Sequence, residues 1–66
     1  MQTEILNQLL IKSRMNQRQF CDKYGFDEGN FSKWISGKIK IKESTLQSIA
    51  TKEGYKIETK YKLIKL

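Results

Sequence analysis

Residues 16–38 read NQRQFCDKYGFDEGNFSKWISGK, and this stretch predicts two short helices joined by a tight turn. Asn16 is expected to begin the first helix, because its side-chain oxygen can accept a backbone N–H from the first turn. Gln19 stands three residues on, where its own side chain can bond back to the cap. Gly25 ends that helix, since glycine readily takes the left-handed conformation of a helix stop. Asp27 can cap the second helix, where its charge suits the positive end of the helix dipole.

The second of these helices has one apolar and one polar side. Phe31, Trp34 and Ile35 are spaced i, i+3 and i+4, so they face the core together. At about 100° per residue, Gly29, Ser32 and Lys33 point the opposite way. A short helix that ends at Gly37 and keeps a polar outer side is suited to contacting a polar partner.

The whole spacing resembles the helix-turn-helix of the Cro and repressor family of phage and bacterial transcription regulators. The matching positions are Gln17, Phe20-Cys21, Gly25-Phe26-Asp27, Phe31-Ser32, Trp34 and Gly37. The resemblance covers roughly residues 4–54. It implies a mostly α fold, a lambda-repressor-like four-helix domain over residues 1–54, in which the second helix of the motif lies in the major groove of DNA. A small helical domain with no DNA role is the alternative.

The resemblance also implies which residues contact DNA. Base edges would be read by Glu28, Gly29, Ser32 and Lys33, and phosphates would be bound by Asn16, Gln17, Asn30, Lys38 and Lys40. Lys33 can donate to guanine, and Glu28 can accept from cytosine. Gly29 has no side chain to offer, so it either lets the backbone approach the DNA closely or only loosens the first helical turn.

Two further helices are expected outside the motif. The first carries the apolar stripe Ile5, Leu6, Leu9 and Leu10, and the last carries Leu46, Ile49 and Ala50. Ser44 and Gln47 form an S-x-x-Q pair that predicts the start of the last helix at Ser44. Between the motif and this helix, Ile39 and Ile41 alternate with lysines, and we expect both isoleucines to anchor a loop. Cys21 is expected to be a small buried hydrophobe.

The tail, residues 55–66, reads YKIETKYKLIKL and changes to a period of two, which predicts a C-terminal β-strand over residues 55–62. No Asn-Gly or Asp-Gly pair is present to turn a hairpin. A lone strand with one apolar face is unstable, so we expect antiparallel pairing with the same strand of a second chain. The dimerisation residues would be Tyr55, Ile57, Thr59 and Tyr61. A tail folded back on its own domain is the alternative.

Composition limits the remaining possibilities. The chain has 66 residues and a net charge of +6, a sign that suits the phosphate backbone of nucleic acids. With one cysteine and no histidine, the sequence offers no disulfide, no metal cluster and no catalytic constellation, so we expect neither an enzyme nor a cofactor. No signal peptide and no long apolar run occur, which predicts a cytoplasmic protein without membrane contact.

These features predict a sequence-specific regulator of transcription, a small Cro-like repressor of phage or prophage type that binds double-stranded DNA. As a homodimer it would occupy a two-fold operator and exclude polymerase sterically, with its two recognition helices about 34 Å apart. The alternative is an antitoxin-type helix-turn-helix protein whose main partner is a toxin protein. The sequence does not choose between them, nor does it specify the operator.

Overall fold

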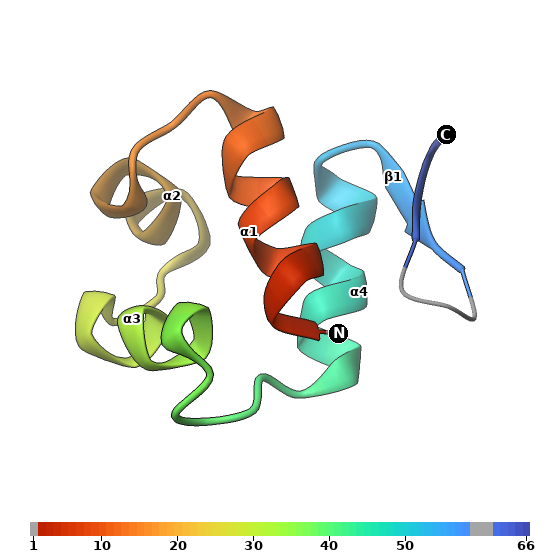
Figure 1. Cartoon of the computed structure of the whole chain (residues 1–66). Coiled ribbons are helices and arrows are strands. Elements are labelled where there is room, and N and C mark those ends of the chain that lie inside the picture. The colour runs from red at the N-terminus through yellow and green to blue at the C-terminus, as the bar shows by residue number, and fades with distance from the viewer. Residues whose placement is uncertain (1, 59–61) are drawn as a thin grey trace.

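The computed structural model describes residues 2–58 and 62–66 of the chain (Figure 1). Its elements in chain order are α1 (Gln2–Ser13), α2 (Gln17–Tyr24), α3 (Glu28–Ser36), α4 (Glu43–Lys52), β1 (Tyr55–Ile57) and β2 (Leu63–Lys65). The predicted mostly α fold with a C-terminal β element is confirmed. In Figure 1, α2 and α3 lie on one side of α1 and α4, and the strands lie on the other. None of the described helices combines the length and the apolar character that crossing a bilayer requires.

The core is formed where the four helices meet. Its buried side chains are Ile5, Leu6, Leu9, Phe20, Cys21, Phe31, Ile41, Leu46, Ile49 and Ala50. Phe20 of α2 packs on Phe31 of α3, with ring centroids 5.4 Å apart. The predicted apolar faces of α1, α3 and α4 and the burial of Cys21 are therefore confirmed, with Leu10 only partly buried at the edge of the core.

The segment between α3 and α4 differs from the prediction in two places. Ile41 is 4% exposed and anchors the segment in the core, whereas Ile39 is 45% exposed, so its predicted anchoring role is wrong. The predicted helix start at Ser44 is also wrong. The N-cap is Lys42, which makes no side-chain cap bond, and its carbonyl accepts the N–H of Leu46 at 3.0 Å. Ser44 consequently lies inside the first turn of α4.

The tail forms a hairpin instead of the single strand predicted over residues 55–62. β1 and β2 pair antiparallel, with Tyr55 opposite Lys65 and Ile57 opposite Leu63. The connection between the strands is longer than two residues, so it does not demand the Asn-Gly or Asp-Gly turn whose absence argued against a hairpin. Ile57 and Leu63 share one face of the sheet, which packs against the helical core.

This hairpin is attached to the helical domain through β1. The ammonium of Lys12, near the end of α1, lies 5.2 Å from the centre of the Tyr55 ring, a favourable cation–π distance. Tyr55 and Ile57 of β1 are half-buried against their own core, as is Leu63 of β2, while Ile64 and Lys65 of β2 are exposed. Of the four predicted dimerisation residues, Thr59 and Tyr61 lie outside the described residues.

Candidate nucleic-acid interface

The first helix of the motif begins with the predicted capping box. The N–H of Gln19 donates to Asn16 Oδ1 at 2.8 Å, and the N–H of Asn16 donates to Gln19 Oε1 at 3.0 Å. These two bonds satisfy N–H groups that the helix itself leaves unpaired. Because Asn16 uses its oxygen in the cap, its Nδ2 group is the part of the side chain left to donate to a phosphate. The helix ends at Gly25, whose φ of 72° lies in the left-handed region.

The cap of α3 explains the glycine in its first turn. Asp27 accepts the N–H of Asn30 at 3.0 Å. A Cβ added at Gly29 would lie 3.1 Å from Asp27 Oδ2, closer than most such contacts, so the capping carboxylate would have to shift. Glycine at this position thus leaves room for the cap, a packing reason that the sequence does not reveal.

The outer side of α3 carries the predicted base-reading group. All four residues of this group are exposed, as is Asn30: Glu28, Gly29, Ser32 and Lys33. Phe31 is fully buried, and Trp34 and Ile35 are half-buried. The helical phase predicted from the sequence is therefore confirmed, although contact with bases stays a prediction.

One hydrogen bond joins the two helices of the motif at this surface. Gln17 Nε2, in the first turn of α2, donates to Ser32 Oγ of α3 at 2.5 Å. The bond brings a predicted phosphate-binding residue and a predicted base-reading residue into contact. It also leaves Gln17 an amide oxygen to accept, and Ser32 a hydroxyl hydrogen to donate. The pair therefore presents both kinds of hydrogen-bonding group on one exposed surface.

The predicted phosphate contacts after α3 lie in the segment that Ile41 anchors. α3 ends at Gly37, with φ 82°, and the N–H of Ile39 then donates to the carbonyl of Lys33 at 3.3 Å. This bond holds the start of the segment against the end of α3. Lys38 and Lys40 are both exposed, so their ammonium groups are available to a polyanion.

Charge is distributed unevenly along the chain. The motif, residues 16–37, contains three basic and three acidic side chains and is therefore neutral. Residues 38–42 carry three lysines and no acidic residue, and residues 55–66 carry four lysines and one glutamate. Each of these two segments has a net charge of +3, which accounts for the chain's +6. Only the first of them directly follows α3.

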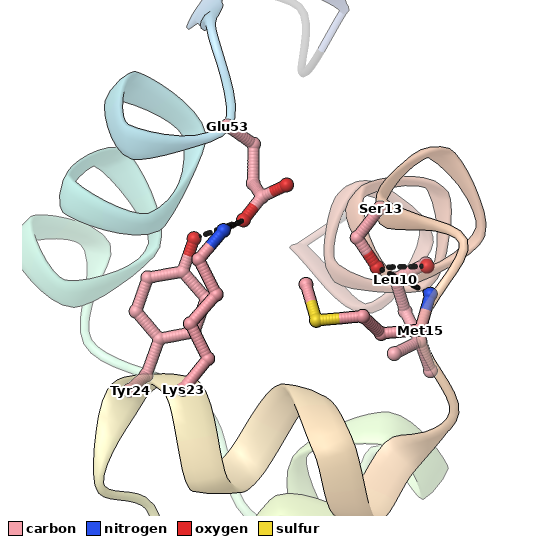
Figure 2. A network of polar contacts seen from close by, with 6 residues as sticks. All are labelled: Leu10, Ser13, Met15, Lys23, Tyr24 and Glu53. Atoms are coloured by element: carbon pink, nitrogen blue, oxygen red, sulfur yellow. Dashed lines mark hydrogen bonds and ion pairs between the residues drawn. The ribbon is translucent and has the colours of Figure 1, made fainter.

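A polar network that the sequence analysis missed ties α2 to the end of α4 (Figure 2). Lys23 Nζ donates to Glu53 Oε2 at 2.8 Å, and the hydroxyl of Tyr24 donates to the same oxygen. The side chain of Glu53 is only 9% exposed, whereas that of Lys23 is 47% exposed. The network therefore anchors one end of the motif to the helix that carries the hairpin.

The ionisation of Glu53 reflects this setting. Burial acts to raise the pKa of Glu53, but the hydrogen bonds from Lys23 and Tyr24 outweigh it, and the pKa lies below its ordinary value of 4.5. Burial, followed by the bond to Glu53, raises the pKa of Tyr24. Glu53 is thus held as a carboxylate and Tyr24 as a neutral donor. Because Lys23 and Tyr24 are about thirty residues from Glu53 in the chain, no local sequence pattern predicts these contacts.

No protein-family model matches the chain, and neither do any of the curated proteins or solved structures.

Proposed function

We propose that this protein is a sequence-specific, double-stranded DNA-binding regulator of transcription. In this proposal α3 enters the major groove, and the protein bound at an operator excludes polymerase sterically. The observation that carries it is the exposed surface joined by the bond from Gln17 to Ser32, which groups the polar residues of α3 with the start of α2. An α-helix fits the major groove of B-form DNA, where each base pair presents a distinct pattern of donors and acceptors.

The groups on this surface match both parts of such recognition. Glu28 and Lys33 offer one acceptor and one donor for base edges. Lys38 and Lys40 follow directly after α3 and supply the positive charge that a phosphate backbone attracts. The neutral motif then carries sequence readout, and the adjacent segment carries the attraction that is independent of sequence.

The aromatic residues argue against single-stranded nucleic acid as the ligand. Binding of single strands uses exposed rings on which bases stack. Here five aromatic side chains contact one another in or beside the core: Phe20, Tyr24, Phe26, Phe31 and Trp34. They do not form an outward-facing platform among the described residues.

Selection from a random library of duplex DNA tests the proposal. We expect enrichment of one short motif by the wild-type protein. Lys33→Ala should relax the preference at one base pair of that motif, while Lys56→Ala, which removes the same charge from the hairpin, should return the wild-type motif. Selection of no motif, or the same motif from all three proteins, would contradict readout by α3. Binding to labelled duplex from upstream of the protein's own gene then tests the regulatory role.

A further inference from the structure

The hairpin register shows which backbone groups of β2 are directed away from β1. The N–H of Glu58 donates to the carbonyl of Lys62 at 2.9 Å, and the N–H of Leu66 donates to the carbonyl of Gly54 at 2.9 Å. In an antiparallel ladder, hydrogen-bonded pairs alternate with pairs whose N–H and C=O groups face outward. Since residues 62 and 66 belong to bonded pairs, the residues at 63 and 65 belong to the outward-facing kind.

The outer edge of β2 is therefore unpaired. Leu63 and Lys65 direct an N–H and a C=O each away from β1, and these groups bond to no other residue in the described parts of the chain. Two aliphatic side chains flank this edge, Ile64 at 38% and Leu66 at 71% exposure. An open edge beside exposed apolar side chains is a template for a further strand.

We propose that the occupant is β2 of a second copy of this chain, paired antiparallel about a two-fold axis at Ile64. The sequence of β2 with one residue on either side, KLIKL over residues 62–66, is complementary to itself in this register. Leu63 lies opposite the partner's Lys65, and Ile64 lies opposite the partner's Ile64. Because every lysine faces a leucine, no like charges are placed directly across the interface.

The outward-facing groups also fit this register. Leu63 and the partner's Lys65 form a hydrogen-bonded pair, and the two-fold axis repeats it, so all the outward N–H and C=O groups of both residues are satisfied. The result is a four-stranded sheet in the order β1-β2-β2-β1. The pairing strand is therefore β2, and Tyr55 and Ile57 of β1 remain packed against their own helical core.

Charge gives this interface a distinctive salt dependence. Each chain carries +6, so two copies repel at long range, and salt screens this repulsion. Self-association should therefore strengthen as salt is added. DNA binding has the opposite dependence, because released counterions oppose it at high salt. An acidic strand of another protein would also bind this edge less well in salt.

The dimer has a consequence that rests on the proposed function. The strands lie on the side of α1 and α4 opposite to α2 and α3 (Figure 1). Pairing through β2 accordingly leaves both candidate DNA surfaces open, with the shared sheet between the two helical domains. The spacing of the two recognition helices is then set by the sheet.

Sedimentation and amide exchange of the full-length protein, measured without DNA, test the pairing. The interface is short, so we expect dimers that form only at high micromolar to millimolar concentration. As the dimer forms, the amides of Leu63 and Lys65 should become protected from exchange. The amide of Ile64, which bonds to β1, should be protected already in the monomer.

Two variants and one control make the test specific to the edge. Ile64→Lys places two lysines opposite each other at the axis and should weaken self-association about tenfold or more. Lys65→Pro removes an outward N–H without touching a bond to β1 and should weaken it too. Ile39→Lys changes an isoleucine of similar exposure far along the chain and should leave self-association unchanged.

Several outcomes would overturn the inference. A chain that stays monomeric at millimolar concentration lacks the interface, whether or not an acidic strand binds there. A dimer in which the amides of Leu63 and Lys65 stay unprotected uses another surface, as does one that Ile39→Lys weakens as much as Ile64→Lys does. Because no DNA is present, these results are independent of whether the protein binds an operator.

Discussion

Replacing Glu53 by glutamine should show how much the network between α2 and α4 contributes to stability. The carboxylate accepts hydrogen bonds from Lys23 and Tyr24 on one oxygen, and its side chain is only 9% exposed. Glutamine preserves the shape of the side chain and can still accept one bond. It removes the negative charge that makes both bonds charge-assisted.

The magnitude follows from these contacts. A hydrogen bond to a charged group contributes about 1.5–3 kcal/mol, against about 1 kcal/mol for a neutral one. Lys23 is about half exposed, so solvent weakens its share, and the bond from Tyr24 accounts for most of the effect. We expect Glu53→Gln to lower the free energy of unfolding by about 1–2 kcal/mol at neutral pH. A domain of this size has only about 3–10 kcal/mol in total.

The pH dependence provides an independent signature. The pKa of Glu53 in the folded protein lies below its ordinary value of 4.5, so the unfolded chain binds the proton more readily. The stabilisation that the Glu53 carboxylate gives to the fold is fully present above pH 4.5, and it is lost as the pH falls through the pKa of Glu53 in the folded protein. Glutamine does not titrate, so the difference in stability between wild type and Glu53→Gln should shrink as the solution is acidified.

Urea denaturation followed by circular dichroism at neutral pH and at several acidic values would measure this difference. The matched control is Glu58→Gln, which removes the same charge at an exposed position of the hairpin and should change stability little. If Glu53→Gln and Glu58→Gln behave alike, or if the Glu53→Gln difference persists unchanged in acid, the network does not stabilise the fold as argued.

Five substitutions in and beside α3 give further predictions. Lys38→Ala and Lys40→Ala should each weaken binding to specific and random DNA by similar factors and lower the salt slope by about one unit, measured by titration at several salt concentrations. Lys33→Ala should cost about 1–3 kcal/mol on the best site only, measured against single-base variants of that site. Trp34→Ala should lower the free energy of unfolding by about 2–3 kcal/mol in urea, less than for a fully buried tryptophan because Trp34 is half-buried. Gly29→Ala should change that free energy by less than about 0.5 kcal/mol, since the helix propensity gained is offset at the cap, yet weaken specific DNA binding.

The features of the motif that could be predicted from the sequence are those that depend on residues close together in the chain. The cap bonds at Asn16 and Asp27 depend on residues at most three positions away, so their residue types and spacing suffice to predict them. The exposed side of α3 follows from helical periodicity, because the buried Phe31 fixes the phase of its neighbours. The contact between Gln17 and Ser32 spans fifteen residues and needs the angle between two helices, which periodicity does not supply.

The tail shows how one pattern can fit two structures. Alternation of apolar and polar residues is expected for one long strand. It is also expected for two short strands if the number of residues between them leaves the apolar residues of both strands on the same face. Ile57 and Leu63 lie six residues apart, an even number, and they face the same side of the hairpin. The alternation therefore indicated β structure correctly, while hydrogen bonds between distant residues, such as that from the N–H of Leu66 to the carbonyl of Gly54 beside the strands, decided the topology.

The distribution of charge separates attraction from readout in the proposed DNA contact. If the phosphate attraction came from α3, substitutions there would alter affinity and specificity together. The motif is neutral, however, and the lysines of residues 38–42 follow it, so in the proposed complex the salt slope is set mainly outside α3. Residues on α3 can then change without loss of general affinity for DNA. The strands of the hairpin lie on the side of α1 and α4 away from α2 and α3, so the described lysines of the hairpin, Lys56, Lys62 and Lys65, do not add to the same DNA contact. In the proposed sheet Lys62 and Lys65 instead lie opposite leucines of the partner strand.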